Sequence, residues 1–184
     1  WLLIFTEKGK CFWMRVFEVP EGAKNTKGRA LQNLINIEPD DSIKAFINAG
    51  DIKDEAYLKD KYIIMCTKKG TIKKTKLEAY SRPRTNGINA INVKDGDVLL
   101  EAKLTHGTHE LMMALRSGKA IRFNEQKVRA MGRTASGVRG VRLANENDEV
   151  IGMICVENEA HHVLVVTEKG NGKRSLVADY RITN

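Results

Sequence analysis

The stretch Tyr62-Ile63-Ile64-Met65-Cys66-Thr67-Lys68-Lys69-Gly70-Thr71 runs from an apolar strand into a basic turn with a glycine at its tip. Glycine permits the positive φ that tight hairpin turns demand. The same kind of turn recurs at Gly9, Gly118 and Gly170, so the four tip glycines are separated by 61, 48 and 52 residues. A period of about fifty residues predicts a propeller-like array, in which each unit needs its neighbours to bury its faces.

A second glycine motif follows three of the four tips at a steady distance. Gly28, Gly87 and Gly137 lie 19, 17 and 19 residues after the preceding tip glycine. A short β-branched run comes next, then an acidic turn, and then an apolar strand. Each unit therefore holds about four short strands separated by turns, and this pattern predicts an all-β fold. The expected strands after the acidic turns are Ile43–Ile47, Val98–Leu104 and Val150–Val156.

The repeat divides the chain into units at roughly 1–61, 62–110 and 111–162, with a partial unit at 163–184. Two short segments could be helical. Asp51–Asp60 could form a helical turn, although it looks more like an insertion between units, and Glu125–Met131 could form a short helix. No segment has sustained helical periodicity. Both ends of the sequence fall inside a repeat, and Trp1 opens a strand, so we expect a fragment of a longer polypeptide.

Charge is sorted by position within the unit. The chain carries a net charge of +8, with seven basic residues and one acid between Lys68 and Arg84. Five basic residues and no acid lie between Lys127 and Arg142, whereas Glu146–Glu159 holds five acids and no Lys or Arg. An ordinary solvated surface mixes the two signs. Units stacked in register would present one basic rim, which favours a nucleic acid as the partner.

Several function classes find no support in the sequence. No apolar run is long enough to cross a bilayer. Three separated cysteines form no CxxC pair, which favours buried thiols in a reducing cytoplasm and no disulfide. The histidines at 106, 109, 161 and 162 lack further ligands at metal-like spacing, so we expect no metal and no cofactor. Neither a patterned nucleophile nor a Walker-type loop is present, so the chain by itself is not expected to be an enzyme.

The stretch from Arg129 to Leu143, RAMGRTASGVRGVRL, closely resembles the C-terminal DNA-wrapping domain of the bacterial DNA gyrase A protein. Gly70–Thr75, Arg84–Gly87 and Gly170–Arg174 look like other blade motifs of that domain. The resemblance implies a β-pinwheel of four-stranded blades that exchange strands with their neighbours, here as a partial array. It also implies a parent topoisomerase driven by ATP, the rest of the gyrase A protein and the gyrase B protein as partners, and a cytoplasmic location at the bacterial nucleoid.

One hallmark of the family is missing. The glycine-rich basic heptad of the first blade does not occur, and Asn25–Arg29 and Arg133–Gly140 are degenerate counterparts. The match implies that the heptad lies upstream of Trp1. It also leaves open the equivalent tail of topoisomerase IV, although the closeness of Arg129–Leu143 favours gyrase. A protein-interaction propeller that does not wrap DNA is an alternative of a different class.

The expected function is sequence-neutral binding and wrapping of double-stranded DNA around the basic rim. The resemblance implies that this wrap supports negative supercoiling by the parent enzyme. Glycine beside Lys or Arg lets backbone N–H groups approach a phosphate, and each cation contact releases condensed counterions. The residues expected to face phosphates are Lys68, Lys69, Lys73, Lys74, Arg82, Arg84, Lys119, Arg122, Arg129, Arg133, Arg139, Arg142, Lys173 and Arg174.

Overall fold

Each tip glycine closes a β-hairpin, as predicted. In the computed structural model, which describes residues 1–183, Gly9, Gly70, Gly118 and Gly170 all have φ between 80° and 85°. A residue with a Cβ rarely adopts this conformation, so glycine is required at the tips. The hairpins pair β1 (Leu2–Thr6) with β2 (Lys10–Met14), β4 (Tyr62–Thr67) with β5 (Thr71–Lys76), β8 (Glu110–Leu115) with β9 (Ala120–Asn124), and β12 (His162–Val166) with β13 (Gly172–Leu176).

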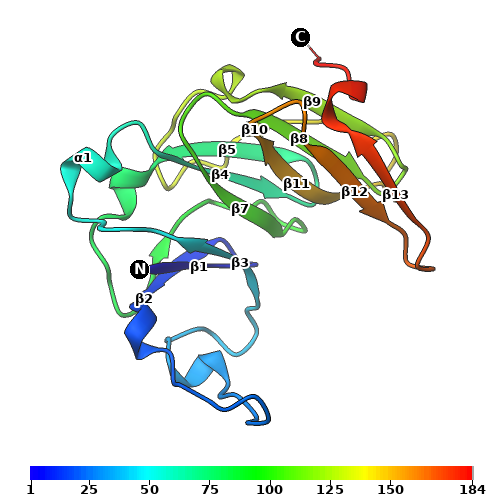
Figure 1. The fold of residues 1–184 in the computed structure, drawn as a ribbon. Coiled ribbons are helices and arrows are strands. Elements are labelled where there is room, and N and C mark those ends of the chain that lie inside the picture. Colours follow the sequence, from blue (N-terminus) through cyan, green and yellow to red (C-terminus); the bar gives the residue numbers. More distant parts are fainter. Residues whose placement is uncertain (184) are drawn as a thin grey trace.

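The apolar strand after each acidic turn returns to its own hairpin. Strand β3 (Ile43–Asn48) pairs antiparallel with β1, β7 (Leu99–Thr105) with β4, and β11 (Val150–Val156) with β8. All three strands begin within one residue of the bounds expected from the sequence. The result is a series of small sheets that follow one another in chain order (Figure 1).

The second glycine motif crosses to the preceding sheet. Strand β6 (Ile88–Asn89) pairs with β2, and β10 (Val138–Arg139) pairs with β5, which completes two four-stranded sheets. The main-chain carbonyl of Gly9 accepts hydrogen bonds from the amides of Ala90 and Ile91, and Gly70 accepts in the same way from Gly140 and Val141. Adjacent units therefore exchange a strand, as the β-pinwheel resemblance implies. Within residues 1–183 the third sheet has three strands and the fourth hairpin two.

The core lies between consecutive sheets. One apolar cluster joins the first two units around Phe5, Met65 and Tyr80, and a second joins the next two around Ile72, Met113 and Val150. The returning strands β3, β7 and β11 pack against one another. The order of the sheets, β3-β1-β2-β6 and β10-β5-β4-β7, places the exchanged strands at the opposite edge. This edge, far from the packed returning strands, is called the rim below.

Helical structure is brief. Helix α1 (Glu55–Leu58) forms where the sequence allowed a helical turn, and the Asp54 carboxylate caps it by accepting from the Ala56 amide. The expected helix at 125–131 is a single 3₁₀ turn, Glu125–Lys127. In the described part of the chain no helix is long and apolar enough to cross a membrane. The other 3₁₀ turns span Val16–Glu18, Leu31–Asn33, Leu77–Tyr80 and Val177–Asp179.

Candidate nucleic-acid interface

Strand exchange brings the basic motifs to the rim. Arg82 and Arg84 lie in the loop that leads into β6, and Arg139 lies in β10 with Arg142 just beyond it. All four side chains are exposed. None of them takes part in an ion pair with a carboxylate of residues 1–183. Their charge is therefore available to an external anion.

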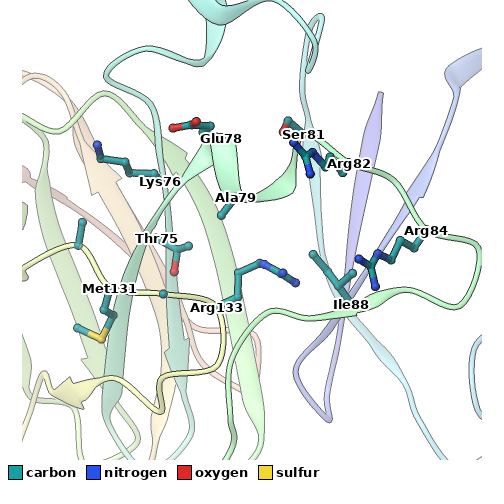
Figure 2. Close-up of a pocket in the computed structure, with 12 residues that line it drawn as sticks. Thr75, Lys76, Glu78, Ala79, Ser81, Arg82, Arg84, Ile88, Met131 and Arg133 are labelled. Atoms are coloured by element: carbon teal, nitrogen blue, oxygen red, sulfur yellow. The ribbon is translucent and has the colours of Figure 1, made fainter.

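A groove of about 690 Å³ opens on the rim between the second and third units. One wall is the loop that carries Arg82 and Arg84, and the other is the segment from Ala130 to Arg133. Figure 2 shows Arg133 reaching across from its own segment toward Ile88, with Arg84 beside Ile88 on the far side. Two crossover segments from consecutive units thus point cations into one space.

The groove is electropositive because basic side chains outnumber acids along its walls. Lys76, Arg82, Arg84 and Arg133 line it together with a single carboxylate, Glu78. The Arg133 guanidinium is half-buried and donates through Nη1 to the Asn89 carbonyl at 3.5 Å. Guanidinium groups bind phosphate oxygens through a planar fork of donors. The geometry suits an extended anion with several phosphates better than a compact ligand.

A second basic hollow, of about 360 Å³, lies at the hairpin tip of the second unit. Lys69, Lys94 and Arg139 line it together with two carboxylates, Asp95 and Asp97, and with Gly70 and Gly137. The nearby Asp97 is already used, because its Oδ1 accepts from the amides of Lys69 at 2.9 Å and Val98 at 2.8 Å. This hollow extends the basic surface from the groove toward the tip.

The acidic turns fasten the hairpin tips. Asp41, Asp97 and Asp148 each accept from a tip amide in their own unit, and Asp148 also accepts from the Ser117 hydroxyl at 3.0 Å. Burial raises the pKa of Asp148, but the hydrogen bonds from the Ser117 amide and hydroxyl outweigh it, and the pKa is lowered. Within the acidic run Glu146–Glu159, Asp148 therefore serves to cap a turn.

Three of the lysines at the tips, Lys8, Lys10 and Lys68, are paired with acids. Lys8 pairs with Asp40 at 2.5 Å and with Glu38 at 3.3 Å, and Lys10 also pairs with Glu38. Lys68 approaches Glu149 at 3.6 Å. The acid beside each of these amines cancels part of the positive potential that a further anion would meet. The loops that contain the second glycine motif therefore present unpaired arginines, whereas several tip lysines are paired.

The prediction of a phosphate-facing role is wrong for Lys74 and Arg122. The Lys74 amine is buried against Glu125 at 2.9 Å and lies over the Tyr62 ring, with Nζ 4.3 Å from the ring centroid. Arg122 is 2% exposed, pairs with Glu110 and Glu159, and donates to the carbonyls of Val177 and Tyr180. Both side chains fasten one unit to the next.

Lys73 is the third correction. Its side chain is fully buried, and the amine donates to the carbonyl of Ala90 at 2.6 Å and to that of Arg133. A phosphate outside the protein cannot reach it. Burial, reinforced by the nearby positive charge of Arg133, lowers the pKa of Lys73 to about 8.

An alignment of the repeats helps to distinguish the buried cations Lys73, Lys74 and Arg122 from exposed ones. The position three residues after the tip glycine holds Phe12, Lys73 and Ile121 in the first three units, and the next position holds Trp13, Lys74 and Arg122. In the fourth unit Lys173 and Arg174 occupy these positions, and both are exposed. Apolar residues in some copies indicate that both positions point inward. Trp13 fills the same role as Arg122, because its Nε1 donates to the Tyr80 carbonyl of the next unit at 3.0 Å. A basic residue at either position is therefore a weak candidate for DNA contact.

The other predicted residues lie on or near the surface. Lys68 and Arg133 are half-buried, and the remainder are exposed, namely Lys69, Arg82, Arg84, Lys119, Arg129, Arg139, Arg142, Lys173 and Arg174. The structure brings Arg82, Arg84 and Arg133 together in the groove and Lys69 and Arg139 in the hollow. Two basic residues that line these features, Lys76 and Lys94, were absent from the predicted set. Their places beside the β5 hairpin and the β-branched run could have suggested them.

A family model described as "DNA gyrase C-terminal domain, beta-propeller" matches residues 1–49, 61–105, 109–157 and 161–184. The chain belongs to this family. The matches cover most of the chain and include both exchanged strands and the rim loops.

The curated relatives that match this member of the DNA gyrase C-terminal domain family are DNA gyrase A proteins. The chain is 41% identical to the DNA gyrase A protein of Chlamydia muridarum over its whole length and 40% identical to that of Salmonella typhimurium over 97% of its length. It spans 22% and 20% of those two relatives. The chain therefore corresponds to about a fifth of the length of these DNA gyrase A proteins.

Two solved structures share the fold. The C-terminal domain of DNA topoisomerase IV aligns with a TM-score of 0.86 and 28% identity, and covers 99% of this chain and 55% of its own. The DNA gyrase A C-terminal domain aligns with a TM-score of 0.81 and 23% identity, and covers 100% of this chain and 56% of its own. Both support the β-pinwheel assignment.

Proposed function

We propose that this chain binds double-stranded DNA along the rim and wraps it. The observation that carries the proposal is the set of arginines on consecutive crossover loops, exposed Arg82 and Arg84 and half-buried Arg133, which have no ion pair within residues 1–183 and meet at a basic groove between units. At the hairpin tips, in contrast, Lys8, Lys10 and Lys68 are already paired with acids. A continuous anionic backbone would satisfy charges on several units at once.

The binding is expected to be largely independent of DNA sequence. Residues 1–183 contain only a four-residue α-helix, Glu55–Leu58, too short to read base edges in the major groove. Contacts to phosphates release counterions and give affinity without base readout. Bending DNA through a tight turn costs several kcal/mol, which must come from many weak contacts distributed over the units.

In the parent protein, the wrap would present DNA to the remainder of a type II topoisomerase and support negative supercoiling. This chain would contribute binding and curvature without catalysis. The rest of the gyrase A protein, the gyrase B protein and the DNA of the bacterial nucleoid in the cytoplasm are the partners that this role requires. The identity of 40–41% with the gyrase A protein over nearly the whole chain favours gyrase over topoisomerase IV as the parent.

A salt titration of duplex DNA binding tests the proposal. Changing Arg84, Arg133 and Arg139 to Ala should weaken affinity and reduce the slope of log affinity against log salt by roughly two to three, at about 0.9 per lost phosphate contact. The matched control changes Lys8, Lys10 and Lys44 to Ala, which removes the same charge from side chains already paired with acids. Equal slopes for the two triple variants would contradict the rim assignment and favour a protein-interaction module.

A further inference from the structure

The Lys73 amine joins two crossover segments of the rim. It donates to the Ala90 carbonyl, which lies just after β6 in the second unit's crossover, and to the Arg133 carbonyl, which lies before β10 in the third unit's crossover. These two segments are the ones that carry Arg84 and Arg133 into the groove. One buried side chain therefore contacts the backbone of both walls.

Few other bonds connect the segments directly. The Asn92 amide donates to the Ala135 carbonyl at 3.3 Å, and Arg133 Nη1 reaches the Asn89 carbonyl at 3.5 Å. Both distances are long for hydrogen bonds, whereas the Lys73 bond to Ala90 measures 2.6 Å. The amine is thus the tightest polar link between the two walls.

Lys73 also differs from the other buried cations because it has no carboxylate partner in residues 1–183. Lys74 pairs with Glu125, and Arg122 pairs with Glu110 and Glu159. Burying an ammonium without a counterion is costly. Phe12 and Ile121 occupy the same place in the first and third units and Lys173 in the fourth, so the blade itself does not require lysine there. The cost of burying Lys73 indicates a task at this pair of loops.

We propose that Lys73 is a positioning residue, which sets the spacing of the two rim walls so that Arg84 and Arg133 meet adjacent DNA phosphates. The inference rests on the proposed function, because it assigns the geometry of that same DNA site. A cationic amine also adds positive potential beneath the groove while remaining out of contact with DNA.

The position makes DNA binding sensitive to mildly alkaline pH. The charged group near the Lys73 amine is Arg133, which does not titrate in this range. Tyr80 and Cys11 also lie near Arg133, and burial raises the pKa of both, so they stay neutral. With a pKa of about 8, Lys73 loses its proton between pH 7 and pH 9. The amine then donates more weakly, and the potential in the groove falls.

The test compares the 184-residue chain with Lys73→Met and Lys73→Ile, the latter introducing the residue of the third unit. Duplex affinity is measured at pH 7 and pH 9 at fixed salt, and hydrogen exchange is followed at the Asn92 amide. The unmodified chain should bind roughly three- to tenfold more weakly at pH 9. Both variants should bind several-fold more weakly at pH 7, show little dependence on pH, and exchange the Asn92 amide faster.

Two results would overturn the proposal. Folded variants that match the unmodified chain in affinity, pH dependence and Asn92 exchange would show that Lys73 only fills space, and would leave DNA binding by the rim intact. A pH dependence that persists in both variants would assign it to other groups. If the unmodified chain binds no DNA while the Asn92 effect is present, then the proposed function fails and Lys73 positions the loops for another partner.

Discussion

At the scale of single residues, the basic side chains divide into two classes that composition does not distinguish. Lys73, Lys74 and Arg122 are buried between units, whereas Arg84, Arg139 and Arg142 are exposed and unpaired. A buried cation holds the array together through carbonyls and carboxylates. An exposed one is free to meet an external anion. The two classes therefore predict different mutational effects.

Arg122 and Lys119 form a matched pair at the same hairpin. Arg122→Met should lower the free energy of unfolding by about 2–3 kcal/mol, because Glu110 and two carbonyls lose their charged partner. Lys119→Met should leave stability within about 0.5 kcal/mol, since its side chain is exposed. Urea denaturation measures both changes. Equal stability losses would contradict the division into classes.

The buried Glu125 carboxylate should influence how the stability of the chain falls at low pH. Burial raises its pKa, but hydrogen bonds from Lys74, His109 and Thr105 outweigh this, and the pKa is lowered below 4.5. A carboxyl whose pKa is lower in the folded state than in the unfolded state stabilises the fold at any pH above its unfolded-state pKa. This stabilisation is lost as the pH falls through the folded-state pKa. Unfolding measured from pH 6 to pH 3 should therefore show a shallower decline in Glu125→Gln than in the unmodified chain. A parallel decline would show that other carboxylates govern acid unfolding.

Sequence reasoning at this scale failed for three inward residues, and the DNA-contact role of the exposed residues stays a prediction. A lysine in a strand is normally assigned to solvent, and only the repeat alignment with Phe12, Trp13 and Ile121 shows otherwise. Burial of these cations depends partly on carbonyls and acids contributed by the next unit. Those partners lie as many as 60 residues away along the chain, as with Lys73 and Arg133, so local pattern does not reveal them.

At the scale of elements, each of the first two hairpins forms a sheet with the strand that the next unit contributes. The hairpins, their glycine tips and the returning strands could be predicted because each depends on local turn chemistry and apolar runs. The β-branched runs that contain strands β6 and β10 are visible in the sequence, but local pattern does not reveal what they pair with. Their pairing with the preceding sheet was implied by the family resemblance alone.

Glycine substitutions isolate the contribution of strand exchange. A Cβ on Gly70 would lie 2.8 Å from Val141 Cγ1 and 3.0 Å from the Val141 carbonyl oxygen, whereas a Cβ on Gly118 would meet nothing within 4 Å. Both residues have positive φ, so both alanine variants carry a backbone strain of about 1 kcal/mol. Gly70→Ala should lose a further ~1–3 kcal/mol of unfolding free energy through overpacking against the exchanged segment. Similar losses for both variants would contradict the role of the contact.

At the scale of the whole molecule, strand exchange and charge placement act together. The returning strands pack at one edge of the sheets and the exchanged strands lie at the other, so the crossover loops carry their arginines to the rim. Apolar clusters between units fix the angle from one sheet to the next. A DNA duplex following the rim would acquire curvature of one hand from this geometry.

The most direct test of the central claim is the linking number of nicked circular DNA ligated in the presence of the 184-residue chain. Wrapping along the rim predicts a shift of one sign that grows with bound protein. The shift should be strongly reduced when Arg84, Arg133 and Arg139 are changed to Ala, and retained when Lys8, Lys10 and Lys44 are changed. Saturated DNA binding by the unmodified chain without any shift in linking number would contradict wrapping.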